Sequence, residues 1–213
     1  MYSFRFLCAL LLAVVSVAAS QTSHKPAAPS APSKTGANEQ MYRNPAFGFR
    51  FKIPYGWVDR TKDMHETDAS EKTAEDKPAT EKSSGTADGN VLLAVFERPP
   101  YATGDTVNSA VVIASESAAS YPGLKKAEDY LGPLTELTTS KGFKAEGEPA
   151  FTSIDTRELV RADFSKALSE SITMHQTTLV LLAKGKLISF TFIGSSEDEI
   201  DELIDGLHFG GAK

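Results

Sequence analysis

An alternation of apolar and charged residues predicts the first strand of the chain. The large apolar residues stand at every second position and are Phe47, Phe49, Phe51 and Ile53. Arg50 and Lys52 fall between them, so an extended chain places the two sets on opposite faces. Asn44-Pro45 before the segment and Pro54-Tyr55-Gly56 after it are turn sequences. The pattern therefore predicts a half-buried strand that ends in an aromatic corner at Tyr55 and Trp57.

Three more segments have the pattern of strands, and one has the pattern of a helix. Residues 91–96 and 107–114 are compact runs rich in β-branched side chains, and residues 156–164 alternate. Residues 143–151 are predicted to be a connection. Between Ala127 and Thr138, apolar residues recur every three or four positions and predict one buried helical stripe. Gly132-Pro133 should kink this helix or restart it with Pro133 in the first turn.

The segment from Ile172 to Ile193 predicts a β-hairpin. Lys184-Gly185 separates two long apolar arms, which suits a two-residue loop. Such a loop pairs Leu181 with Ile188, Leu179 with Phe190 and Thr177 with Phe192. Both faces of the hairpin are substantially apolar, so it should lie centrally in the sheet with helices on both sides.

A last helix is predicted to follow this hairpin. Ser196 and Glu199 match a capping box, and the acidic first turn suits the positive end of the helix dipole. Gly206 and Gly210-Gly211 should stop the helix, with Phe209 packed back on the sheet. The buried stripe is predicted to comprise Ile200, Leu203, Ile204 and Leu207.

The flanking segments indicate export of a single domain. Residues 1–20 combine Arg5, an apolar run and small residues before Gln21, as a secretory signal peptide does. The uncharged run is shorter than the roughly 20 apolar residues of a membrane-spanning helix. We therefore expect cleavage and no integral membrane segment afterwards. Cleavage also removes Cys8, the only cysteine, and so excludes thiol chemistry from the mature protein.

Two polar stretches accompany the predicted domain, which spans residues 41–209. Residues 21–40 form a Pro/Ala/Ser-rich leader, and residues 59–90 form a polar insert between two strands. Neither carries enough apolar surface to offset its ordering entropy, so both are predicted to be disordered. Residues 210–213 are a short tail.

The charge of the chain narrows the class of partner. The formal net charge is -6 and becomes more negative when Arg5 leaves with the signal peptide. Nucleic-acid partners and anionic membranes both require a basic surface, so neither is expected. The partner is therefore expected to be a protein or another component of the cell envelope.

Two segments together resemble the PsbP-like superfamily. They are Phe-Gly-Phe-Arg-Phe-Lys-Ile-Pro-Tyr-Gly-Trp, ending at Trp57, and Ser-Phe-Thr-Phe-Ile-Gly-Ser-Ser-Glu-Asp-Glu, ending at Glu199. The resemblance covers about Met41 to Phe209 apart from the polar insert. It implies an α+β fold, a three-layer α/β/α sandwich with a mainly antiparallel central sheet. A Ran-binding nuclear import factor and bacterial exported proteins of unknown function share this fold. The resemblance implies a non-enzymatic accessory or assembly module.

The chemistry of the chain indicates no active site, metal site or cofactor. The histidines lack ligands at metal spacing; they are His24, His65, His175 and His208. Ser195 lies between a strand and a helix but lacks a nucleophile elbow, so a helix cap explains it better. The acidic residues of the last helix lack a calcium loop and resemble a solvated face. A hydrolase using Ser195 or His175 stays an alternative.

The remaining candidates are binding residues. Tyr55 and Trp57 could receive a peptide or glycan, or could plug the core. Tyr101 follows the stiff Pro99-Pro100 segment, which could equally line a groove or simply end a strand. Arg161 shares a strand face with Asp163, where a cross-strand ion pair or a recognition site is possible. We therefore predict a periplasmic or secreted, non-catalytic binding or assembly module. The second alternative is a structural envelope protein tethered by its leader.

Overall fold

The computed structural model describes residues 40–64, 89–100 and 104–210. The chain divides after Gly36, and all described residues belong to the unit that begins at Ala37. The predicted signal peptide, nearly all of the leader, Tyr101, most of the polar insert and the end of the tail lie outside the described residues.

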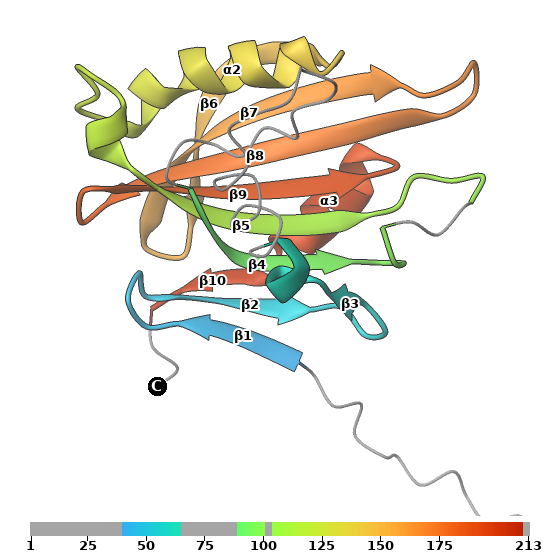
Figure 1. The fold of residues 1–213 in the computed structure, drawn as a ribbon, viewed down its shortest axis with the longest axis horizontal. Coiled ribbons are helices and arrows are strands. Elements are labelled where there is room, and N and C mark those ends of the chain that lie inside the picture. Colours follow the sequence, from blue (N-terminus) through green and yellow to red (C-terminus); the bar gives the residue numbers. More distant parts are fainter. Residues whose placement is uncertain (1–39, 65–88, 101–103, 211–213) are drawn as a thin grey trace, which may run out of the picture. The chain divides into compact units, whose positions relative to one another are not determined.

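Within the described residues, seven antiparallel strands form the larger of two sheets (Figure 1). Their spatial order is β3-β4-β5-β9-β8-β7-β6, so β9 is central as predicted. The strands are β3 (Val58–Asp59), β4 (Asn90–Phe96), β5 (Ala110–Ser117), β6 (Lys144–Ile154), β7 (Arg157–Ala167), β8 (Thr173–Ala183) and β9 (Lys186–Gly194).

A second sheet of three strands has β2 in its centre. Its order is β1-β2-β10, and both pairings are antiparallel. The strands are β1 (Gln40–Asn44), β2 (Phe49–Ile53) and β10 (Leu207–Phe209). Residues 61–64 are helical, and four helical elements lie further along the described chain. They are η1 (Ala118–Ser120), η2 (Ala127–Tyr130), α2 (Leu131–Ser140) and α3 (Glu197–Ile204).

Each face of the seven-stranded sheet packs on its own hydrophobic core. On one face, Leu134 of α2 lies in a cluster with Val160 and Val180 of the sheet. On the other, the rings of Phe49 in β2 and Phe190 in β9 meet edge to face with their centroids 5.0 Å apart. Helix α3 contributes Ile200 to this second cluster. The expected mainly antiparallel sheet is therefore present with few helices, and a second sheet shares one face with α3.

The β8–β9 hairpin has the predicted register. Leu181 pairs with Ile188, Leu179 with Phe190 and Thr177 with Phe192. The loop residues Lys184 and Gly185 have φ of 53° and 72°. A tight two-residue hairpin loop needs this left-handed conformation, and glycine adopts it without strain.

Both predicted helices are present, but the predicted capping box of α3 is only half formed, because Glu199 accepts from the N–H of Ser195 and not of Ser196. Helix α2 begins after the 3-10 turn η2, with Pro133 in its first turn, so the chain restarts as expected. Ser196 caps α3 by accepting a hydrogen bond of 3.2 Å from the backbone N–H of Glu199. Leu207, however, was wrongly assigned to the helical stripe, because α3 ends at Ile204 and Leu207 begins β10.

The prediction of a connection over residues 143–151 is wrong, because β6 starts at Lys144. This strand is the edge of the larger sheet, and its register with β7 shifts between Glu146 and Ala150. Edge strands tolerate charge, proline and bulges that a central strand would exclude. Their pattern therefore resembles that of a loop, which is why the alternation test missed β6. Strand β1 was missed in the same way.

Candidate functional site

The end of β2 with the turn after it and α3 with the residues that follow it form the walls of an open groove. Its volume is about 470 Å³. The apolar part of the lining comprises Pro54, Trp57 and Leu203, and the polar part comprises Lys52, Glu199, Glu202, Asp205 and Gly206. The two walls come from opposite ends of the domain sequence and meet only in the folded protein.

A backbone hydrogen bond joins two residues that line the groove. The N–H of Lys52 in β2 donates to the carbonyl oxygen of Gly206 over 2.9 Å. Gly206 must approach this strand closely, because a Cβ there would lie 3.2 Å from the carbonyl oxygens of Leu203 and Lys52. The absence of a side chain at Gly206 therefore lets the end of α3 lie directly against β2.

The two predicted aromatic residues at this corner have different environments. Trp57 is half-buried, packs against the main hydrophobic core and lines the groove. Tyr55 is 87% exposed although its neighbours Pro54 and Trp57 both line the groove. Trp57 thus packs on the core and also lines the groove, whereas the side chain of Tyr55 is largely exposed.

The groove carries more negative than positive charge. Glu199 accepts hydrogen bonds from the hydroxyl of Ser109 and, over 2.8 and 2.6 Å, from the N–H and hydroxyl of Ser195. Desolvation acts to raise the pKa of Glu199, but these hydrogen bonds outweigh it and lower the pKa. Glu199 is therefore ionised at neutral pH. Glu202 and Asp205 are exposed carboxylates on the same wall.

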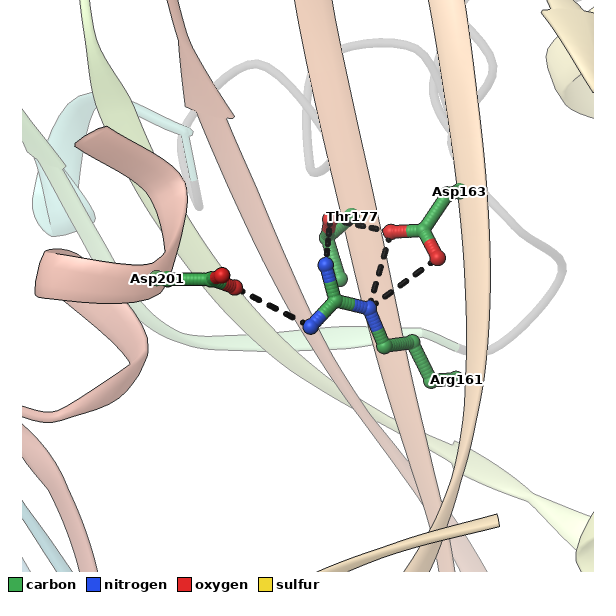
Figure 2. Close-up of polar contacts among 4 residues, drawn as sticks. All are labelled: Arg161, Asp163, Thr177 and Asp201. Atoms are coloured by element: carbon green, nitrogen blue, oxygen red, sulfur yellow. Dashed lines mark hydrogen bonds and ion pairs between the residues drawn. The ribbon is translucent and has the colours of Figure 1, made fainter. Parts of the chain in front are cut away.

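Arg161, the third predicted binding residue within the described part of the chain, joins the sheet to α3 (Figure 2). Its Nε donates to both oxygens of Asp163 over 3.0 Å, and its Nη1 donates to Asp201 of α3 over 3.0 Å. Thr177 donates to Asp163 over 2.5 Å. The Arg161–Asp163 pair thus runs along one strand, whereas the expectation was a cross-strand pair.

The charges around Arg161 favour its cationic form. Burial acts to lower the pKa of Arg161, but the charge of Asp163 and the hydrogen bond to Asp201 raise it. Because Asp201 lies on α3, the ion pair holds this helix against β7. Arg161 therefore positions the wall of the groove and does not line it.

The candidate catalytic residues do not form a catalytic pair. The Ser195 hydroxyl donates to the carboxylate of Glu199, and no hydrogen bond joins it to His175 in the part of the chain that the structure describes. His175 lines a separate pocket of about 160 Å³ together with Glu146 and Asp163. Over the described ranges, no group of three or more His, Cys, Asp or Glu side chains could hold a metal ion.

Sequence reasoning missed the carboxylates of the groove. Glu202 and Asp205 were interpreted as a solvated helix face, because nothing local in the sequence shows that Trp57 lies opposite them. One feature of the sequence could have indicated them, namely negative charge at the end of a predicted helix. Glu202 lies in the last turn of α3 and Asp205 at its C-cap, where the helix dipole favours positive charge. Glu116 was also missed; it is buried on β5 beside two tyrosines.

Comparisons with known proteins give the class of fold. No protein-family model and no curated protein matches the chain. Among solved structures, cyanobacterial PsbP (CyanoP) from Synechocystis sp. PCC 6803 is similar, with a TM-score of 0.50 and 15% identity over 84% of this chain and 97% of that one. The Ran-binding protein Mog1p from Saccharomyces cerevisiae has a TM-score of 0.41 and 10% identity over 82% of this chain and 96% of its own.

The similarity to cyanobacterial PsbP supports the predicted PsbP-like fold class, but not the three-layer arrangement of the predicted sandwich. The described unit is an α+β domain with a PsbP-like fold and a mainly antiparallel sheet. Across the described ranges, no helix combines the length and apolarity needed to cross a membrane.

Proposed function

We propose that this protein is an exported, non-catalytic binding or assembly module that engages a protein partner through the groove beside Trp57. The observation that carries the proposal is the juxtaposition of a half-buried tryptophan wall, an 87% exposed Tyr55 and an open groove. Protein interfaces concentrate their binding free energy in aromatic residues that become desolvated on contact. Tyr55 and Trp57 offer this surface within one turn.

The geometry of the groove favours binding over chemistry. Catalysis of acyl transfer requires a nucleophile next to an effective base. The Ser195 hydroxyl donates to Glu199, whose pKa is lowered by its hydrogen bonds, so this carboxylate is a weak base. Helix α3 is held in place by Arg161 and by the close approach of Gly206 to β2. A preformed wall of this kind lowers the entropy lost on association.

Export is the second part of the proposal. Its support is the signal-like order of charged, apolar and small residues over positions 1–20, which favours a location in the periplasm or outside the cell. The partner is then a protein complex or another envelope component. A structural role in the envelope is the alternative.

Site-directed photo-crosslinking in the exporting cell tests the binding role. A crosslinking amino acid replaces Tyr55 in one strain and Leu168, which is 48% exposed in the β7–β8 loop, in a control strain. We expect a discrete protein adduct from position 55 and none from position 168. Absence of any adduct from position 55, or the same adducts from both positions, would contradict a partner bound at the groove.

A further inference from the structure

We propose that the groove receives a lysine- or arginine-bearing segment of the protein partner, with the aliphatic stem of the basic side chain on Trp57 and its cationic end at Glu202 and Asp205. This inference rests on the proposed function and specifies the chemistry of the partner.

Charge complementarity is the first argument. The lining has three carboxylates, from Glu199, Glu202 and Asp205, and Lys52 as its basic residue. Glu199 is already occupied by Ser109 and Ser195. Glu202 and Asp205 form no ion pair with any residue in the described ranges, so their charges are open to a cation from outside. An anionic ligand would be repelled by the same wall.

The position of these carboxylates on α3 is the second argument. The last turn of the helix has no basic residue, while Glu202 lies in it and Asp205 is the C-cap. Negative charge at a helix C-terminus interacts unfavourably with the helix dipole. The two carboxylates therefore reduce the stability of the fold. A residue that breaks a local rule without a compensating contact is expected where it serves binding.

The aromatic wall is the third argument. Trp57 and Pro54 after β2 and Leu203 of α3 give the groove apolar surface in addition to its charged residues. Lysine and arginine side chains combine a long apolar stem with a cationic end, so they suit a lining that is both apolar and acidic. A cation over a tryptophan ring gains further attraction from the ring quadrupole. A purely apolar segment would leave the carboxylates desolvated and unpaired, which disfavours it.

Tryptophan fluorescence measures this binding directly, because Trp57 is the only tryptophan of the chain. The probe is a six-residue peptide of alternating lysine and alanine, and its control has glutamate in place of lysine. With the mature protein we expect a saturable change in Trp57 emission for the lysine peptide and none for the glutamate peptide. Raising the salt concentration should weaken the binding, because exposed charges are screened.

Charge-reversal variants locate the site. Glu202→Lys and Asp205→Lys should each lower the affinity for the lysine peptide by about tenfold, which is the loss expected for one charge-assisted contact. Asp198→Lys is the matched control: it changes the net charge equally and lies on α3, but Asp198 does not line the groove. It should leave the affinity within about twofold. The melting temperature of the Glu202→Lys and Asp205→Lys proteins should stay equal or rise by about 1–3 °C, because they relieve the dipole conflict.

Each other outcome overturns the proposal. An equal loss for Asp198→Lys would mean non-specific attraction to an acidic protein. A Trp57 signal that depends on protein concentration instead of on peptide would mean that a second copy of the chain occupies the groove. If crosslinking from position 55 persists unchanged in the Glu202→Lys protein, the binding role stands but the basic partner does not. If crosslinking from position 55 fails in the unaltered protein, the proposed function itself fails.

Discussion

Gly206 shows at the scale of one residue how the groove depends on close packing. A Cβ at this position would lie 3.2 Å from two carbonyl oxygens and from the ring of Phe51, which is fully buried. Gly206→Ala should therefore push the end of α3 away from β2 and lower the free energy of unfolding by about 1–3 kcal/mol. Urea denaturation measures the change.

Gly132→Ala is the matched control for this prediction. Gly132 lies in α2, where an added Cβ would meet no atom within 4 Å. Alanine is the better helix former, so this variant should gain up to about 1 kcal/mol. A loss of similar size in both variants would show that the close approach of Gly206 to β2 has no special role.

Buried Glu116 makes the stability of the protein sensitive to alkaline pH. Its carboxylate accepts hydrogen bonds from the hydroxyls of Tyr121 and, over 2.9 Å, of Tyr130. Desolvation, together with the hydrogen bond to Glu116 and its charge, raises the pKa of Tyr121 from 10.0 to about 12. The protonated tyrosine is thus favoured in the folded state. The contribution of Tyr121 to the free energy of unfolding is complete below pH 10 and is lost as the pH rises toward 12.

We therefore expect the melting temperature to fall between pH 10 and about 12, and to fall less steeply in a Tyr121→Phe protein. Circular dichroism at a series of pH values measures both slopes. Tyr55→Phe is the control, because Tyr55 is 87% exposed and should keep the slope of the unaltered protein. If the melting temperature fell equally steeply with pH in all three proteins, Tyr121 would not be the cause of the alkaline sensitivity.

At the scale of elements, the sequence pattern predicted those strands and turns whose structure depends on neighbouring residues. The β8–β9 hairpin follows from two alternating arms and a loop that needs left-handed residues, so its register could be derived. The short strand β10 depends instead on β2, which is more than 150 residues away in the sequence. No periodicity over three residues indicates such a strand, and Leu207 was therefore assigned to the preceding helix.

The hairpin and the helix cap should differ clearly in their contributions to stability. Phe190 is fully buried at the centre of the sheet and touches the rings of Phe49 and Phe209. Phe190→Ala should lower the free energy of unfolding by about 3–5 kcal/mol. Ser196→Ala removes one cap hydrogen bond and should lower it by about 1 kcal/mol. Chemical denaturation of both variants tests the ranking, and comparable losses would contradict it.

At the scale of the whole molecule, the candidate site is a product of tertiary structure. The sequence indicated Tyr55 and Trp57 because aromatic residues at a strand end stand out locally. It could not indicate Glu202 or Asp205, because their relation to Trp57 exists only when α3 turns back against β2. Arg161 was selected as a binding residue, but its role as an anchor for α3 depends on Asp201 from another element.

Export is testable on the whole chain. If residues 1–20 are a signal peptide, the exported protein should begin at Gln21, as N-terminal sequencing of the periplasmic or secreted fraction would show. Ser20→Trp replaces the small residue before the expected cleavage point and should leave the precursor uncleaved. Recovery of a protein that starts at Met1 from the cytoplasm would contradict export.

The last prediction separates a binding module from an enzyme in the intact protein. Tyr55→Ala should weaken partner binding by about 1–2 kcal/mol, because an exposed aromatic at an interface centre is a typical hot spot. His175→Ala should leave binding unchanged, since His175 lines the separate pocket between the sheet and α3. Affinity for the crosslinked partner and the melting temperature should be measured for both variants. The opposite result would be a loss of function in His175→Ala and unchanged binding in Tyr55→Ala. It would place the functional site in the second pocket and favour an enzyme, because the groove would then have no measurable effect on binding.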